Sequence, residues 1–170
     1  MKYRSEKDKC YGVAGMDIGL SVFDAEDLLS EVNIDADGMD CVQFVPDFYY
    51  TGSPRVPASK SWHHIYAHYQ VSMGLAIANV LCRKMVLDHG VLDRKRRDEL
   101  LDAAVADGLA LCQLDRDEVE PMFDKSYSYL MRVFGNRDIQ RVINDFAEQL
   151  RQHRALTRSE VAELLQELNL

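Results

Sequence analysis

The sequence lacks the short motifs that accompany the commonest enzyme chemistries. Its 170 residues contain no G-x-S-x-G nucleophile elbow, no P-loop and no G-x-G-x-x-G dinucleotide fingerprint. The four cysteines form no C-x-x-C pair, and Cys82 and Cys112 lie in apolar helical patterns that are typical of buried thiols. These absences favour a protein that is not an enzyme and has no cofactor, and they leave an enzyme or a divalent metal at His64 and His68 as the alternative.

A secretory signal and an excess of basic charge are also missing. The charged segment 1–9 is not followed by the apolar region of a signal peptide, which predicts a cytoplasmic protein with reduced thiols. Lys and Arg number 20 against 28 Asp and Glu, for a net charge of −8. Between Asp24 and Pro54 there are eight acidic residues and no Lys or Arg. Because such a surface repels phosphate backbones, nucleic acid is not an expected partner.

One long stretch lacks charge altogether. The 22 residues from Ser61 to Cys82 include no Asp, Glu, Lys or Arg. They do include three histidines and several other polar groups, which would be costly in lipid. The strictly apolar part, Val71–Cys82, is too short to cross a bilayer. We therefore predict a buried core helix over residues 61–89 and no membrane partner.

The residues after this stretch predict further helices. Apolar residues recur at three- and four-residue spacing between Arg137 and His153, and Thr157 with Glu160 forms a capping box for a last helix. Short connections favour antiparallel neighbours. The fold class is therefore predicted to be mainly α, an up-down bundle of about five helices around residues 61–89. The bundle domain is assigned to residues 59–170.

Residues 1–58 are predicted to form an acidic segment that packs on the bundle and is not independent of it. Residues 1–11 are expected to fray, and the glycine-rich segment 12–19 to form a loop or irregular strand. Asp24 is expected to cap a short helix, Ala25–Val32. The β-prone segment Cys41–Tyr50 is the best strand candidate, at a sheet edge because it contains Pro46.

Two residue patterns suggest a metal site. His64 and His68 are spaced i, i+4 on one helical face, which allows two imidazoles to share a metal, although no third ligand can be placed from the spacing. The segment from Asn33 to Gly38 resembles the first half of an EF-hand calcium loop. That resemblance ends at position 12 of the loop, where Phe44 replaces the bidentate Glu. Asp and Asn also favour turns for local reasons.

Several residues are candidates for an interaction surface. The small residues Gly74 and Ala78 share a helical face and allow close approach of another helix, either within the bundle or across a dimer. The basic run 94–97 is the only one in the chain and could face an acidic partner, although it is also typical of a solvated helix start. An aromatic group flanks the Gly-Pro linker; if exposed it would bind protein, and if covered it would dock the acidic segment on the bundle. Its members are Phe44, Phe48, Tyr49, Tyr50 and Trp62.

These observations favour a regulatory or protein-interaction module that binds a protein partner or self-associates as a dimer. The alternative is a helical-bundle enzyme, or a binder of a small ligand or metal, with a polar pocket near His64, His68 and Tyr69. Convergence of the two histidines with a carboxylate from another helix would favour the alternative.

Overall fold

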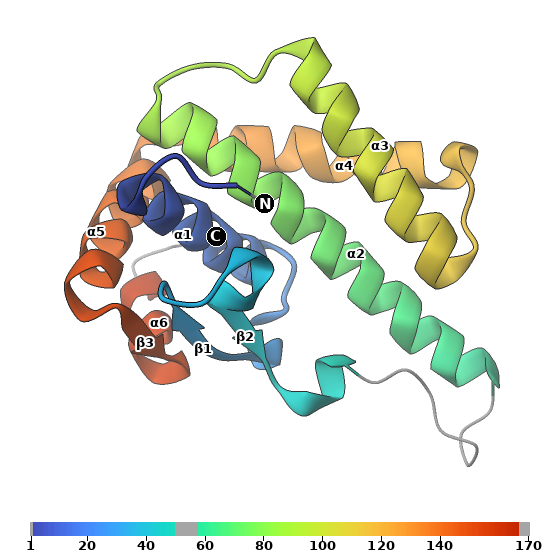
Figure 1. Ribbon diagram of the computed structural model, residues 1–170, viewed down its shortest axis with the longest axis horizontal. Helices are drawn as coiled ribbons and strands as arrows, with labels where there is room; N and C mark the ends of the chain where they lie inside the picture. The colour runs from blue at the N-terminus through green and yellow to red at the C-terminus, as the bar shows by residue number, and fades with distance from the viewer. Residues whose placement is uncertain (1, 50–57, 167–170) are drawn as a thin grey trace.

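The computed structural model describes residues 2–49 and 58–166, and within them the chain is mainly helical (Figure 1). Six helices are accompanied by a small three-stranded sheet and several short helical turns. The helices are α1 (Glu6–Val22), α2 (Ala58–Cys82), α3 (Arg94–Cys112), α4 (Arg116–Gly135), α5 (Arg137–His153) and α6 (Arg158–Leu165). The strands are β1 (Leu29–Asn33), β2 (Val42–Phe44) and β3 (Ala155–Thr157).

Helix α2 is the hub of the bundle, as the sequence predicts. It packs against α1, α3 and α4, and it crosses the middle of the molecule in Figure 1. Lys60–Leu87 is the one described helix that is long and apolar enough to span a membrane, and half of its most apolar window is buried inside the protein. A core helix of a soluble protein passes the same test of length and composition. The prediction of a mainly α bundle is confirmed.

The C-terminal helices begin where their capping residues predict. The side chains of Asp93, Asp115, Asn136 and Thr157 each accept a hydrogen bond from a backbone N–H in the first turn of the following helix. Helix α5 then buries one complete apolar face, made by Ile139, Val142, Ile143, Phe146 and Leu150. These boundaries follow from local chemistry alone, so they could be read from the sequence.

The N-terminal prediction was wrong. Residues 1–11 were expected to fray and residues 12–19 to form a loop, but Ser5 caps helix α1, which runs through both segments. Its glycines allow close packing: a Cβ on Gly15 would lie 2.4 Å from Cβ of Cys82, and one on Gly19 would lie 3.1 Å from Cβ of Ala78. The glycines therefore form the face of α1 that contacts α2, and they do not break the helix.

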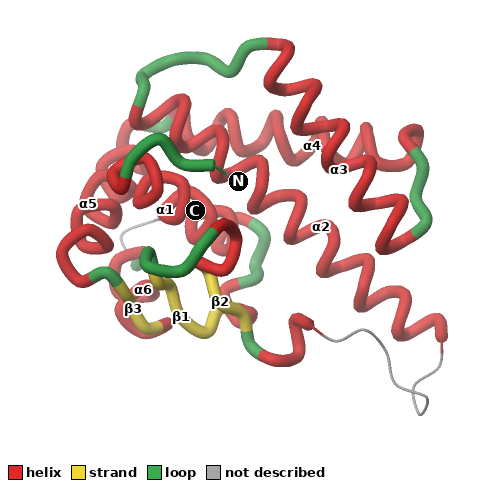
Figure 2. The backbone as a smooth tube through the Cα atoms, in the orientation of Figure 1, coloured by secondary structure: helices red, strands yellow, loops and turns green. Residues whose placement is uncertain are grey.

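The next two segments also differ from expectation. The predicted helix Ala25–Val32 is instead a short 3-10 turn, Glu26–Leu28, followed by strand β1, which pairs on both sides. Asp24, the expected cap, has a positive φ of 51°, and the turn has no side-chain cap. Only Val42–Phe44 of the predicted strand 41–50 forms β2; a 3-10 turn follows at Pro46–Tyr49, and Tyr50 lies outside the described residues. The strand order is β2-β1-β3, and all pairs are antiparallel (Figure 2).

Strand β3 was not expected, and it matters for the site. Val32 of β1 pairs with Val42 on one side and with Leu156 of β3 on the other. This pairing brings α6, which follows β3 directly, against the N-terminal part of the chain. The two ends of the sequence therefore meet around one small sheet.

Candidate ligand site at Asp17

The structure brings the two predicted metal ligands together, but without a third group. The ring centroids of His64 and His68 lie 4.1 Å apart, and the Phe48 ring stacks on His68 at 4.6 Å. Burial, and secondarily the charge of His64, lowers the pKa of His68. Among the described residues no cluster of three or more His, Cys, Asp or Glu side chains could hold a metal ion. The histidine pair belongs to an aromatic stack.

This stack closes one side of an apolar cavity of about 500 Å³ between the β2 segment, α2 and α3. Phe44 and Phe48 stack on each other at 4.0 Å and line the cavity. Tyr69 lies in its wall, buried, and its hydroxyl donates to the carbonyl oxygen of Ala104 at 2.9 Å. Trp62 stacks on Tyr66 and is 43% exposed. The side chain of Tyr49, like Tyr50, lies outside the described part of the chain.

Gly74 and Ala78 pack inside the protein, so they are not free to form a dimer contact. A Cβ on Gly74 would lie 2.3 Å from the ring of Phe23, and Ala78 has an exposed fraction of 0% against α1. Of the two alternatives that the sequence leaves open, the small-residue face serves the contact within the bundle. Helix α1, which the sequence did not predict, occupies that face.

The segment from Asn33 to Gly38, which resembles half of a calcium loop, forms a turn whose Asp35 pairs with Arg154. Asn33 Oδ1 accepts a hydrogen bond from the N–H of Asp35 at 2.8 Å, as in an ordinary Asx turn. Both carboxylate oxygens of Asp35 accept from the guanidinium of Arg154. This carboxylate is therefore already neutralised by a residue of the same chain.

Asp17 is a fully buried acidic residue without a partner. Its exposed fraction is 0%, and neither carboxyl oxygen has a hydrogen-bond partner in the described structure. The other two buried polar side chains of the described residues are paired. Asp8 accepts a hydrogen bond from Arg83 Nε at 2.9 Å, and Asn79 donates one to the Tyr3 hydroxyl at 3.0 Å. Because native proteins satisfy most buried polar groups, an orphan carboxyl group is a candidate functional group.

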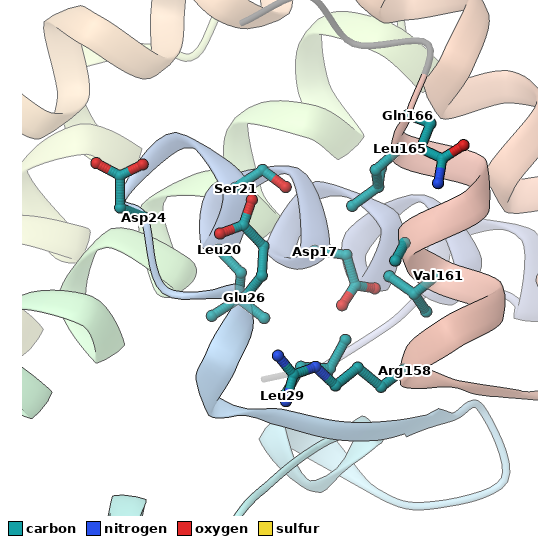
Figure 3. A pocket seen from close by; sticks show the side chains of 11 residues that line it. Asp17, Leu20, Ser21, Asp24, Glu26, Leu29, Arg158, Val161, Leu165 and Gln166 are labelled. Carbon is teal, nitrogen blue, oxygen red and sulfur yellow. The ribbon is translucent and has the colours of Figure 1, made fainter.

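Helix geometry directs Asp17 away from α2. The glycine face of α1 contacts α2, and Asp17 follows Gly15 by two residues, about 200° around the helix. In Figure 3 its carboxyl group points from α1 toward Val161 of α6. Helix α6 is held there by the β1–β3 pairing and by the Thr157–Glu160 capping box at its start.

The space between α1 and α6 is a cavity of about 440 Å³ (Figure 3). Its lining is mixed: apolar side chains stand beside the polar side chains of Ser21 and Gln166 and beside exposed charged groups. The apolar lining residues are Leu20, Leu29, Val161, Ala162 and Leu165, and the charged ones at the rim are Asp24, Glu26 and Arg158. A volume of this order is within the range of sites that bind small molecules.

Burial decides the protonation state of Asp17. It raises the pKa of this carboxyl group well above its ordinary value, since no donor or cation replaces the lost water. The nearest cationic residue of the cavity lining, Arg158, is bonded instead to exposed Asp27. The raised pKa therefore favours the neutral form of the Asp17 carboxyl group, and a cation brought beside it would favour the paired carboxylate.

Sequence reasoning missed this site, although a signal is present. Asp17 is the only charged residue between Lys9 and Asp24. A single acid within an apolar segment indicates a buried carboxyl group only if the segment is a helix or strand in the core. Because residues 12–19 were interpreted as a loop, the lone Asp carried no meaning.

Comparisons with known proteins do not supply a function for this chain. No family model matches it, and no curated protein or solved structure is significantly similar to it. The Asp17 cavity is therefore interpreted from its own chemistry: an unpaired carboxyl group, a lining of apolar and polar side chains, and a charged rim.

Proposed function

We propose that this protein binds a small amphipathic amine in the Asp17 cavity, and that it acts by binding and not by catalysis. The observation that carries the proposal is the orphan carboxyl group of Asp17, which is covered from solvent and belongs to the lining of a cavity of about 440 Å³. An ammonium group supplies both the hydrogen-bond donors and the positive charge that this carboxyl lacks.

The walls define the rest of the ligand. Five of the lining side chains are apolar, so the body of the ligand is a short alkyl or aryl group that fills the space beside Leu29 and Val161. Asp24 and Glu26 add negative charge at the rim, which attracts a cation and disfavours an anion. The ligand class is therefore a monoamine with an apolar body.

Binding of such a cation is coupled to proton release. The neutral Asp17 must ionise to pair with an ammonium group, so each bound amine releases about one proton where the free protein holds Asp17 protonated. A neutral ligand of the same shape releases none. This coupling gives a signature that non-specific apolar binding does not share.

The test is isothermal titration calorimetry with hexylamine and phenethylamine, and with hexan-1-ol as the neutral analogue. Wild-type protein is expected to bind the amines, and titrations in two buffers of different ionisation enthalpy should give a release of about one proton per amine. Asp17→Asn is expected to weaken amine binding about tenfold or more, the value of a hydrogen bond to a charged group.

Asp24→Asn is the matched control for this test. It removes one acidic charge from the same cavity, but at an exposed position whose φ of 51° suits Asn. Its effect on amine affinity should be less than about twofold, since exposed charges interact weakly. Equal affinity of Asp17→Asn and wild type, or equal binding of the alcohol and the amines, would reject the proposal.

The sequence-based expectation of a protein partner has one supporting observation, the exposed Trp62 stacked on Tyr66 at 5.1 Å. Tryptophan is enriched at the centres of protein interfaces. We propose this surface as a second candidate function, together with the cytoplasmic location predicted from the sequence. It is independent of the amine site, because neither Trp62 nor Tyr66 lines the Asp17 cavity, and the start of α2 and helix α6 lie on different sides of the molecule in Figure 1.

A further inference from the structure

A further pocket, of opposite charge to the Asp17 cavity, lies where α2 ends and α3 begins. It has a volume of about 530 Å³ and is lined by five cationic side chains and two carboxylates. The cations are Lys2, Arg4, Arg83, Lys84 and Arg96. In a chain with a net charge of −8, this pocket gathers a quarter of all the Lys and Arg side chains, 5 of 20.

Two of the cationic side chains, Arg83 and Arg4, already pair with carboxylates of the same chain. Arg83 donates from Nε to Asp8 at 2.9 Å, and Arg4 donates to Asp8 at 2.7 Å and to Asp88 at 2.9 Å. These bonds neutralise Asp8 and Asp88. The guanidinium groups still contribute donors to the pocket wall, but their first role is to hold the N-terminus against α2.

The other three cations have few partners of their own. Lys84 has only a distant ion pair with Asp88, at 3.9 Å between Nζ and Oδ2. In the described structure no carboxylate lies within ion-pair distance of the side chains of Lys2 or Arg96. The second carboxylate of the lining, Asp93, is occupied as a helix cap and accepts the backbone N–H of Arg96. The pocket therefore has an uncompensated positive charge.

The backbone at this pocket is a π-helical turn, Arg83–Leu87, which is a rare conformation that is frequent at functional sites. The turn closes through the N–H of Gly90, which donates to the carbonyl oxygen of Lys84 at 2.9 Å. A Cβ on Gly90 would lie 3.0 Å from Cε of Lys84. The glycine therefore leaves room for the Lys84 side chain to lie along the turn, with its ammonium group at the pocket.

We propose that this pocket binds the phosphate group of a small soluble molecule, with Lys84, Arg96 and Lys2 as its ligands. Phosphate carries two charges and accepts several hydrogen bonds, which matches lysine and arginine side chains with few partners of their own. The inference is independent of the amine site: the two cavities share no lining residue and have opposite charge.

The test is titration of the full chain with sodium pyrophosphate, followed by calorimetry and by thermal unfolding. Wild-type protein is expected to bind pyrophosphate, and the affinity should fall as salt is raised because the contact is between charges. A double substitution, Lys84→Gln with Arg96→Gln, should weaken binding about tenfold or more. Both side chains are outside the Arg4–Asp8–Arg83 network, so the variant keeps the contacts that hold the fold.

Arg94→Gln is the matched control. Arg94 lies two residues before Arg96 in the same basic run, its side chain is 94% exposed, and it pairs only with Asp98 at 3.7 Å. Its substitution removes one positive charge of this run without touching the pocket, so pyrophosphate affinity should change less than about twofold. An equal loss in Arg94→Gln and in the double variant would show non-specific attraction and overturn the proposal.

A flotation assay separates the two sources of a phosphate group. Vesicles of phosphatidylcholine with phosphatidic acid are offered to the same proteins. The expected result is pyrophosphate binding in solution and no flotation with vesicles. Flotation without pyrophosphate binding would overturn the proposal, as would wild-type protein that binds neither probe.

Discussion

Replacing Asp17 by Asn is the sharpest perturbation of this fold, because it removes one ionisation and leaves the shape of the side chain almost unchanged. Asp17 is 0% exposed and unpartnered, and its burial raises the pKa of its carboxyl group well above the ordinary value. Asparagine resembles the protonated acid but cannot ionise. The variant therefore isolates the effect of protonation on stability.

The sign of the effect follows from the raised pKa. Below about pH 4 the carboxyl is protonated in both the folded and the unfolded chain, and protonation contributes no difference. As the pH rises above about 4, the unfolded chain ionises while the folded one does not, so wild-type stability falls. The fall is about 1.4 kcal/mol per pH unit until the pH reaches the folded-state pKa.

The magnitude is large for a domain of this size. Two pH units correspond to about 2.7 kcal/mol, against a total stability of about 5–15 kcal/mol for typical domains. Asp17→Asn should gain stability over wild type by this amount across any two units within the window. At about 2–4 °C per kcal/mol, the melting temperatures of the two proteins should diverge by roughly 5–11 °C.

The assay is urea unfolding of wild type, Asp17→Asn and Asp24→Asn at half-unit steps from pH 4 to pH 8. The free-energy difference between wild type and Asp17→Asn should grow steadily from about pH 4 and then become constant. Asp24→Asn should run parallel to wild type, since Asp24 is exposed. Parallel curves for wild type and Asp17→Asn would mean that the carboxyl ionises as freely in the folded chain, and the reasoning behind the amine site would fail.

Two further predictions concern the packing and charge of α1. Gly15→Ala should lower the free energy of unfolding by about 3 kcal/mol, because the new Cβ would lie 2.4 Å from Cβ of Cys82 and 2.8 Å from the carbonyl oxygen of Ala78. The control Gly135→Ala, whose Cβ would have no atom within 4 Å, should be neutral or slightly stabilising in urea titrations. Equal effects of the two substitutions would contradict the close α1–α2 contact. Asp8→Asn should cost about 3–5 kcal/mol at pH 7, because it leaves the guanidinium of Arg83, 16% exposed, without its carboxylate. Hydrogen bonds from Arg83 and Arg4 lower the pKa of Asp8, so the wild-type protein should lose this stability as the pH falls below about 4. An Asp8→Asn variant that unfolds at the wild-type temperature at pH 7 would refute the pairing.

The helices from α2 onward could be predicted because their signals are local. A capping side chain such as Asp115 or Thr157 acts on backbone groups two or three residues away. The apolar face of α5 repeats at helical spacing within one segment. No information from distant parts of the chain is needed to recognise either.

The N-terminal part could not be predicted because its structure depends on distant residues. Glycine lowers intrinsic helix propensity, so Gly12, Gly15 and Gly19 indicate a loop. The close contacts with α2 reverse that preference, and they become visible only when Cys82 and Ala78 are known to lie opposite. Strand β1 is likewise fixed by partners on both sides, Val42 and Leu156, which are 10 and 124 residues away in the sequence from Val32.

The candidate site shows the same limit. His64 and His68 were identified from their spacing, and the spacing did bring their rings together. Whether a third ligand joined them depended on the positions of other helices, which no spacing specifies. Asp17 had no spacing pattern at all, and its significance comes from the sheet that places α6 over it.

Helix α1 contains a second buried aspartate, Asp8, with which Asp17 can be compared. Asp8 and Asp17 are nine residues apart on the same helix, and both are almost fully buried, at 1% and 0% exposure. Around Asp8 the fold places two guanidinium groups, and the pKa of that carboxyl is lowered; around Asp17 it places none, and the pKa is raised. An apolar residue at position 17 would avoid the cost of an unpaired buried polar group, about 1–3 kcal/mol. The pairing of Asp8 and the lack of a partner at Asp17 within the described structure support the proposal that a ligand from outside pairs with the Asp17 carboxyl group.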